Sequence, residues 1–354
     1  MPSPATKGLI LAAGGSGEAF WPRGEVGSRE LLPVANRALL EHALDAMAAA
    51  GVRSVAIAVS ALSNGPVREV VGDGRRHGVR VRYLPARRDS GLVDAVASAQ
   101  RFLAGARCVA QRGDVILSEG LGGLVAEAVD DDLDALLPVE RPASGDVVGI
   151  EDEAVLRLLG GRTGEAVGGR WCEALVVSER FVLAACELRP RARLVSVLDQ
   201  LLASGGRART RTLAHWARRV VSRDDLLDVN RLMLERLHPD YDEALLVDSS
   251  VQGRVSIAPS AVLDSTIVRG PSIIGAGARL RHAYIGPYTA IGDDVLVEGT
   301  EIEHSIVLSG ATIQHLGRRL ESSVVGHGAR VFRDFALPRA LRLQVADGDQ
   351  ISLG

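Results

Sequence analysis

The chain begins with a short apolar run that leads directly into a cluster of glycines, Gly8-Leu-Ile-Leu-Ala-Ala-Gly-Gly-Ser-Gly17. Residues 8–13 are typical of a buried strand, and the glycines that follow are typical of a tight turn before a helix. Glycines let the backbone approach a bound group closely, and their consecutive N–H groups can form a concave site for an anion. The stretch therefore predicts a strand that ends in a loop suited to phosphate groups.

Further apolar runs and helical periodicities alternate along the first part of the chain. They predict strands at 52–59, 79–84, 107–111 and 175–177, and helices at 39–50, 92–103, 121–129, 194–203 and 224–237. Alternating strands and helices favour a mostly parallel sheet with helices on both faces, in which ligands bind at the carboxyl ends of the strands. The glycine loop and Asp114 both fall at such strand ends.

The pattern changes near residue 250, where apolar residues begin to recur at every sixth position. The recurring residues are Ile267 and Ile273, Ile274 and Leu280, and then Ile285, Ile291 and Val297. This period, with glycines after several of the apolar residues, is typical of a parallel β-helix built from hexapeptide repeats. An antiparallel β domain with turn glycines is the alternative. We expect an α/β domain at 1–240 and a left-handed parallel β-helix at 241–354, with Ile285 and Ile291 inside the coil.

The composition is that of a soluble globular protein, with 47% hydrophobic and 24% charged residues among 354. A net charge of −3 disfavours nucleic acid or an anionic membrane as the main partner. The three cysteines, Cys108, Cys172 and Cys186, form no C-x-x-C pair, which favours a reducing compartment. No signal peptide precedes Gly8 and no apolar run is long enough to cross a bilayer, so we expect a cytoplasmic protein.

An α/β head that opens with this glycine loop and is followed by a hexapeptide tail resembles the sugar-1-phosphate nucleotidyltransferases. Within them, it is most similar to the long form of glucose-1-phosphate thymidylyltransferase. The resemblance covers essentially the whole chain, and the stretches that carry it are Leu31–Arg37, Asp225–Asn230, Val268–Gly275, Tyr284–Tyr288 and Ile302–Leu308. It implies a Rossmann-like nucleotidyltransferase domain ahead of the β-helix.

The resemblance also implies a set of site residues. A nucleotide would contact Arg29, Gly91 and the loop residues Ala13, Gly14, Gly15, Ser16 and Gly17, and Asp114 would be a ligand of Mg²⁺. A turn-capping role is an equal alternative for Asp114. The implied partners are a nucleotide or sugar nucleotide, and either further copies of the chain or an intact homologue.

Several positions depart from the family pattern. The loop continues as Glu18-Ala19 where the family has Thr-Arg, and Ser28-Arg29 replaces Pro-Lys. The base-reading glutamine falls at Ala86. Trp216 is followed by Ala-Arg-Arg instead of the pattern that carries a second metal-binding aspartate. The family's sugar-binding motifs fall near Gly160-Gly161-Arg162 and near Arg193–Ser196.

These departures leave no residue to which a catalytic role can be assigned, and they leave three hypotheses. In the first, the chain is a non-catalytic homologue that binds a ligand or assembles with a partner. In the second, it is an active nucleotidyltransferase with reassigned residues such as Arg23, Arg29 and Arg162. In the third, it is an enzyme with different chemistry on the same scaffold. We favour the first, because several independent losses of charge stabilisation compound.

Overall fold

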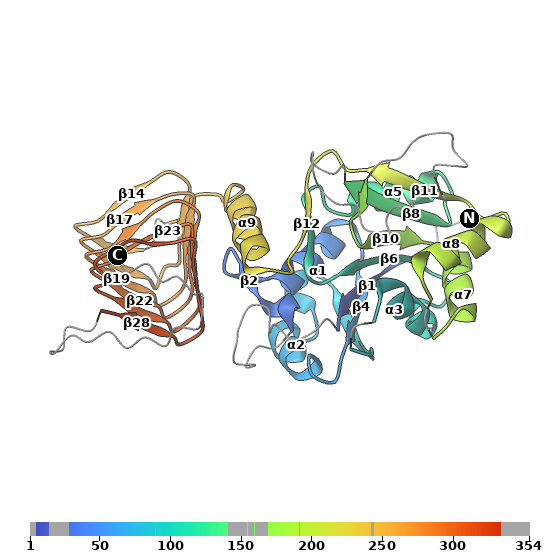
Figure 1. Ribbon diagram of the computed structural model, residues 1–354, viewed down its shortest axis with the longest axis horizontal. Helices are drawn as coiled ribbons and strands as arrows, with labels where there is room; N and C mark the ends of the chain where they lie inside the picture. Colours follow the sequence, from blue (N-terminus) through green and yellow to red (C-terminus); the bar gives the residue numbers. More distant parts are fainter. Residues whose placement is uncertain are drawn as a thin grey trace, which may run out of the picture. The chain divides into compact units, whose positions relative to one another are not determined.

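The computed structural model describes residues 5–13, 28–88, 90–140, 154, 159, 169–190, 192–241 and 244–333. The chain forms two compact units, one made of Met1–His238 with Pro271–Ile273 and the other of Pro239–Gly270 with Ile274–Gly354 (Figure 1). The predicted loop residues Gly14 to Gly17 lie outside the described residues, as do Glu18, Ala19, Arg23 and Arg162.

The first unit is built on a mixed sheet with the strand order β11-β8-β10-β6-β1-β4-β5, and β9 pairs with β8. Only β10 runs antiparallel to its neighbours along this path. The expected mostly parallel sheet is therefore confirmed. The strands are β1 (Thr6–Ala12), β4 (Ser54–Val59), β5 (Arg80–Pro85), β6 (Arg107–Arg112), β8 (Ala135–Glu140), β9 (Arg170–Trp171), β10 (Ala174–Val177) and β11 (Ala208–Thr212).

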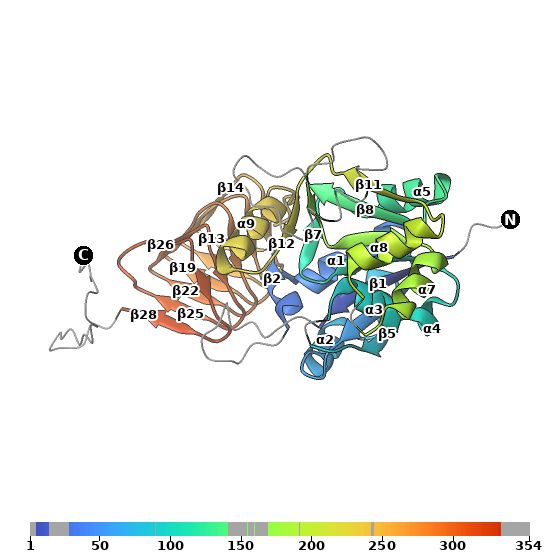
Figure 2. The ribbon, with the colours of Figure 1, turned by 45° about the vertical axis from the view of Figure 1, so that its right-hand side comes forward.

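Helices cover both faces of this sheet (Figure 2). The side chains of β1 alternate, because Leu9 and Leu11 pack into one apolar cluster and Ile10 and Ala12 into the other. One cluster includes α3 (Leu92–Ser98), α7 (Glu179–Glu187) and α8 (Leu194–Ala203), and the other includes α1 (Leu39–Ala49), α2 (Asn64–Val71) and α5 (Gly122–Asp130). The predicted helix at 92–103 is two helices in the structure, since α4 (Gln100–Leu103) begins after Ala99.

Smaller elements complete the first unit. They are β2 (Pro33–Val34), β3 (Arg37–Ala38), β7 (Val115–Leu117), β12 (Ala217–Arg219), α9 (Arg223–Leu234) and the 3₁₀ turns η2 (Arg29–Leu31) and η3 (Arg75–His77). The turn between β2 and β3 has positive φ at Ala35 and Asn36, as a two-residue hairpin requires. Its Ala35 N–H donates to Oδ1 of the buried Asn230 at 2.9 Å, which joins two of the stretches that carry the resemblance.

The second unit is a coil in which the strands of successive turns stack into three sheets. Their strand orders are β13-β16-β19-β22-β25-β28, β14-β17-β20-β23-β26 and β15-β18-β21-β24-β27 (Figure 1). The first two sheets are parallel throughout, and so are β21, β24 and β27 in the third. This is a parallel β-helix, and the antiparallel alternative is excluded.

Each coil of the β-helix contributes one short strand to each sheet. The strands are β13 (Leu245–Val247), β14 (Ser250–Gln252), β15 (Val255–Ile257), β16 (Val262–Asp264), β17 (Ile267–Arg269), β18 (Ser272–Ile274), β19 (Arg279–Arg281), β20 (Tyr284–Ile285), β21 (Thr289–Ile291), β22 (Leu296–Glu298), β23 (Glu301–Glu303), β24 (Ile306–Val307), β25 (Thr312–Gln314), β26 (Leu320–Glu321), β27 (Val324–Val325) and β28 (Arg330–Phe332).

Ile285 and Ile291 are fully buried in the core of the coil, as predicted. The predicted pattern is wrong at Ile267 and Ile273. Ile267 is 45% exposed and Ile273 is only half-buried, whereas the next residues, Val268 and Ile274, point inward. The physical reason is the length of the coil. Equivalent residues lie 17 positions apart in the first coils and 16 or 18 apart in later ones, so a strict period of six drifts out of register.

One corner of the β-helix turns through residues that are mostly not glycine. Successive coils place Asp248, Ser265, His282 and Gly299 there with positive φ. Short polar side chains tolerate this conformation better than branched apolar ones do. The residue that follows each of these corner positions often has a hydroxyl side chain. The hydroxyls of Thr266 and Thr300 each donate to the backbone carbonyl two residues earlier, at 3.0 Å. None of the described helices in either unit combines the length and the apolar character that a membrane span requires.

Candidate functional site: an arginine cluster around Asp114

The candidate site lies where β1, β4 and β6 end at one edge of the sheet. The Gly113 N–H donates to the Leu11 carbonyl at 2.9 Å, and the Ser63 hydroxyl donates to the Ala12 carbonyl at 2.8 Å. A Cβ at Gly113 would lie 2.9 Å from Cγ of Glu30, so only glycine fits this close approach. The fold thus brings the predicted residues Ala13 and Asp114 to the same edge, as parallel strands require.

Arginine side chains surround the Asp114 carboxylate, which is 0% exposed. Arg112 donates through Nε to Oδ1 at 3.0 Å, and Arg219 donates through Nε to Oδ2 at 3.4 Å. Arg29 reaches Oδ2 at 3.9 Å. We call these three residues the arginine cluster.

Two carboxylates join the cluster at its margin. Glu173, in the turn between β9 and β10, accepts from Arg219 at 2.8 Å and lies 3.9 Å from Arg112. The backbone of Glu173 has a positive φ, and its carbonyl accepts the Arg112 N–H. Glu30 is fully buried and takes a hydrogen bond from the Ser28 hydroxyl. Three carboxylates therefore face three guanidinium groups.

The pairing of β12 with β7 explains why Arg219 lies beside Asp114. Arg219 is opposite Val115 in this antiparallel pair, and the Val220 N–H donates to the Asp114 carbonyl at 2.9 Å. Arg218 lies on the same short strand but binds Glu140 at 2.6 Å and approaches Asp228 at 3.5 Å. The stretch after Trp216, where the family resemblance implied a second metal ligand, thus supplies two paired arginines.

The cluster is charged at neutral pH. Burial raises the pKa of the Asp114 carboxyl, but Arg112, Arg219 and Arg29 together outweigh burial and hold that pKa below its ordinary value. Burial likewise acts to lower the pKa of Arg112, while Asp114, Glu173 and Glu30 raise it above its ordinary value. Asp114 is therefore an ionised carboxylate whose charge is compensated by guanidinium groups.

The residues present do not fit a magnesium site. Magnesium needs oxygen ligands at about 2.0–2.1 Å, and it is usually held by one or two carboxylates together with water and phosphate. Guanidinium nitrogens at 3.0 and 3.4 Å already occupy the approaches to both Asp114 oxygens. Within the described ranges, no three His, Cys, Asp or Glu side chains are grouped to hold a metal ion. The metal role of Asp114 therefore stays a prediction, and the arrangement of these arginines speaks against it.

The other residues named from the sequence are not part of the arginine cluster. Gly91 is the N-cap residue of α3, and Ala86 follows β5 and packs on the apolar core. Arg193 is the N-cap residue of α8, outside the described cluster. Sequence reasoning missed Arg112 and Glu173 altogether. The signal for Arg112 was its position just before the Gly113-Asp114 pair at a strand end.

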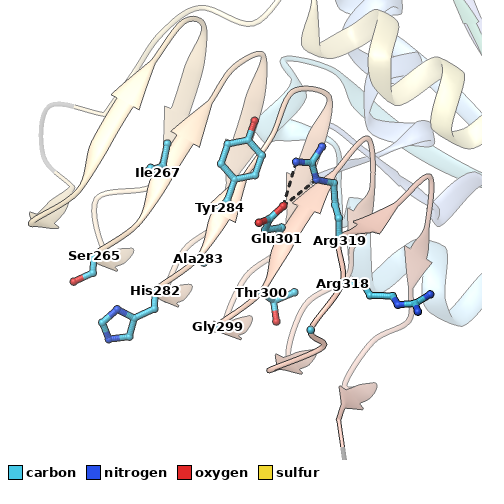
Figure 3. Close-up of a pocket in the computed structure, with 11 residues that line it drawn as sticks. Ser265, Ile267, His282, Ala283, Tyr284, Gly299, Thr300, Glu301, Arg318 and Arg319 are labelled. Atoms are coloured by element: carbon cyan, nitrogen blue, oxygen red, sulfur yellow. Dashed lines mark hydrogen bonds and ion pairs between the residues drawn. The ribbon is translucent and has the colours of Figure 1, made fainter. Parts of the chain in front are cut away.

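Away from the arginine cluster, a hollow of about 570 Å³ lies on the β-helix, along the sheet that contains β17, β20 and β23 (Figure 3). Tyr284 lies on its floor, and the Arg319 guanidinium stands 5.4 Å from the Tyr284 ring centre while it binds Glu301 at 3.1 Å. None of the predicted site residues lines this hollow.

A mostly parallel α/β sheet with a Gly-Asp pair at the end of β6, joined in one chain to a parallel β-helix, defines the architecture of a sugar nucleotidyltransferase with a β-helical tail. Comparison with known proteins agrees with this class. The chain belongs to the nucleotidyl transferase family, whose model matches residues 7–142.

The relatives extend the likeness to both units. The chain is 30% identical to a glucose-1-phosphate thymidylyltransferase of Streptomyces griseus, over 96% of this chain and 98% of that protein. It is also 30% identical to a low-salt glycan biosynthesis nucleotidyltransferase, Agl11, of Haloferax volcanii, over 98% of this chain and 100% of that protein. A crystal structure described as a glucose-1-phosphate thymidylyltransferase from Bacillus anthracis has a TM-score of 0.56 and 20% identity, and it covers 64% of this chain and 95% of that one.

Proposed function

We propose that this chain is a sugar nucleotidyltransferase homologue that has lost or changed the transfer chemistry and binds a nucleotide or sugar nucleotide in a sugar-nucleotide or natural-product pathway. The observation that carries this proposal is the arginine cluster, because guanidinium groups hold the carboxylate that would otherwise bind metal.

Transfer of a nucleotidyl group depends on positioning and on stabilising the charge that develops at the reacting phosphate. Removal of one such stabilising group typically lowers the rate by about 10²–10³. Here Asp114 is bound to arginine, Arg218 is bound to Glu140, and Ala86 offers no side-chain hydrogen bond to a base. These changes affect different parts of the reaction, so their effects should multiply.

Retained binding is supported by the groups that remain at the sheet edge. Ala13 and Gly113 keep backbone close to the site, Gly91 begins α3, and Arg29 supplies a positive charge. Residues 14–17, which the resemblance assigns to the phosphates, follow directly after Ala13 in the sequence.

Purified protein is expected to release little or no pyrophosphate from dTTP and glucose 1-phosphate in the presence of Mg²⁺. Two lost stabilising groups alone predict a rate at least about 10⁴ lower than that of an intact enzyme. The measurement is a coupled pyrophosphate assay, with the Streptomyces griseus relative under identical conditions as the control. A rate comparable to that relative would contradict the proposal and favour an active enzyme with reassigned residues.

We further expect the chain to self-associate or to join an intact homologue. Leu245, Leu246 and Val247 of β13 are all exposed, and β13 pairs only with β16 among the described strands. An open strand edge with apolar side chains favours association. Light scattering after gel filtration should give a mass above that of one chain, and a Leu245→Glu/Val247→Glu variant should reduce it. A monomeric mass with no partner recovered would contradict this expectation.

A further inference from the structure

We propose that Arg29, Arg112 and Arg219 form a phosphate-binding site that works without a divalent metal and takes the diphosphate of a nucleotide or sugar nucleotide. The proposal rests on the proposed function, because it assigns a binding role to the residues that prevent the metal-dependent one.

The cluster has more hydrogen-bond donors than its carboxylates can accept. Three guanidinium groups carry about fifteen N–H donors, while Asp114, Glu173 and Glu30 together offer about twelve lone-pair positions, one of which takes the Ser28 hydroxyl. Arg112 donates to both Asp114 oxygens, at 3.0 and 3.4 Å, whereas the contacts of Arg219 and Arg29 to Asp114 are long, at 3.4 and 3.9 Å. The Nε of Arg29 is buried and has no hydrogen-bond partner among the residues that the structure describes. A buried donor without a partner is unfavourable, and a phosphate oxygen would satisfy it.

Burial separates the parts of the cluster into a support and a binding face. Asp114 is inaccessible, whereas the side chains of Arg112, Arg29 and Arg219 are 10%, 16% and 35% exposed. Asp114 therefore orients the guanidinium groups from below, and a ligand would reach them from their exposed side, where Arg219 is the most accessible. Planar guanidinium groups bind phosphate through paired hydrogen bonds, which suits two adjacent phosphate groups better than one carboxylate.

Glu173 is the group that opposes this ligand. Its side chain is 26% exposed, and it competes for Arg219 at 2.8 Å. The carboxylates Asp114, Glu173 and Glu30 balance the three guanidinium charges, so a phosphate must displace or repel Glu173 to gain its full attraction. Removing the charge of Glu173 should therefore strengthen binding, while removing an arginine should weaken it.

The test is isothermal titration of the full-length protein with pyrophosphate and with dTDP, first in EDTA and then in millimolar Mg²⁺. Both probes should bind in EDTA, and Mg²⁺ should not strengthen the binding. Arg29→Gln and Arg219→Gln should each weaken binding about tenfold or more, since each removes a charge-assisted contact. Glu173→Gln should tighten it several-fold. Weaker binding in the arginine variants and tighter binding in Glu173→Gln would be the result of a ligand site, because general damage to the fold would weaken binding in all of them.

The matched control is Arg209→Gln, because Arg209 also pairs with carboxylates, Asp131 and Glu127, but lies on β11. The Arg209→Gln variant should bind pyrophosphate and dTDP with the same affinity as the unchanged protein. Melting temperatures establish that each variant is folded, and Arg219→Lys, which keeps the charge but not the planar fork, replaces Arg219→Gln if that variant unfolds.

Binding that requires Mg²⁺, or that survives both Arg29→Gln and Arg219→Gln, would overturn this inference. So would the absence of binding by folded protein in EDTA. Pyrophosphate release assayed on the same samples distinguishes the two proposals. Rapid release of pyrophosphate with Mg²⁺ would show that the proposed function is wrong. No release of pyrophosphate, together with no binding in EDTA, would contradict only the proposal of a phosphate-binding site.

Discussion

Replacing Ile285 with aspartate is expected to unfold the β-helix. Ile285 is fully buried in β20, between β17 and β23, and it packs in the single apolar core of the coil. An unpaired carboxylate in such a place costs at least several kcal/mol, and the stacked coils depend on one another for burial. Circular dichroism on heating should show loss of the strand signal at a much lower temperature than in the unchanged protein.

Ile267→Asp is the matched control for this prediction. Ile267 lies in the same sheet, on the neighbouring strand β17, but its side chain is 45% exposed. The substitution should change the free energy of unfolding by only about 0.5 kcal/mol. An Ile285→Asp protein as stable as the control would show that the inward-facing register of the β-helix is wrong.

Asp114→Asn is expected to destabilise the first unit strongly. The change leaves Arg112, Arg219 and Arg29 without the buried charge that compensates them. Removal of one partner from a buried ion pair typically costs about 3–5 kcal/mol. Denaturant unfolding followed by fluorescence measures the effect, and Asp131→Asn, at an exposed pair with Arg209, should change the stability by less than about 1 kcal/mol.

The opposite result has an equally clear meaning. If Asp114→Asn made the protein more stable, the carboxylate would be unfavourable without a bound ion, which is the behaviour of a metal ligand. That outcome would favour the active, magnesium-dependent alternative over the arginine cluster as the role of Asp114.

The pH dependence of stability gives a second check on Asp114. Its pKa is lower in the folded protein, so its contribution is fully present above the unfolded value of about 3.9. The contribution is lost as the pH falls through the lower folded pKa. The unchanged protein should therefore lose stability steeply in strong acid, and the Asp114→Asn variant should show a shallower loss over the same range.

Much of the α/β fold could be predicted because local patterns carry it. The apolar run at β1 and the helical periodicities at α1 and α8 match the observed elements closely. The helices α2 and α7 were not predicted. In α2, Asn64-Gly65-Pro66 resembles a loop, and the helix depends on burial of Val67 and Val71 against the sheet, which no local pattern reveals.

The β-helix could also be predicted as a fold, but not residue by residue. Its existence follows from the repeated apolar positions, and Ile285 and Ile291 lie inside as predicted. Which residues of each coil, 16 to 18 residues long, point inward was not predictable throughout, because corner residues such as Ser265 and His282 adopt positive φ without being glycine. Their conformation depends on hydrogen bonds from neighbouring coils, such as that from the His282 N–H to the Asp264 carbonyl at 3.0 Å.

The sequence by itself determined the fold class and the β-helix, and it predicted departures from the family pattern at positions such as Ala86 and Arg218. It also placed Arg29 and Asp114 among the functional candidates. Only the tertiary structure decided what surrounds Asp114, because Arg29, Glu173 and Arg219 come from distant parts of the chain and meet only when it folds. An electrostatic environment depends on distances in space, and a carboxylate bound by guanidinium groups has the same sequence signature as one that binds a metal.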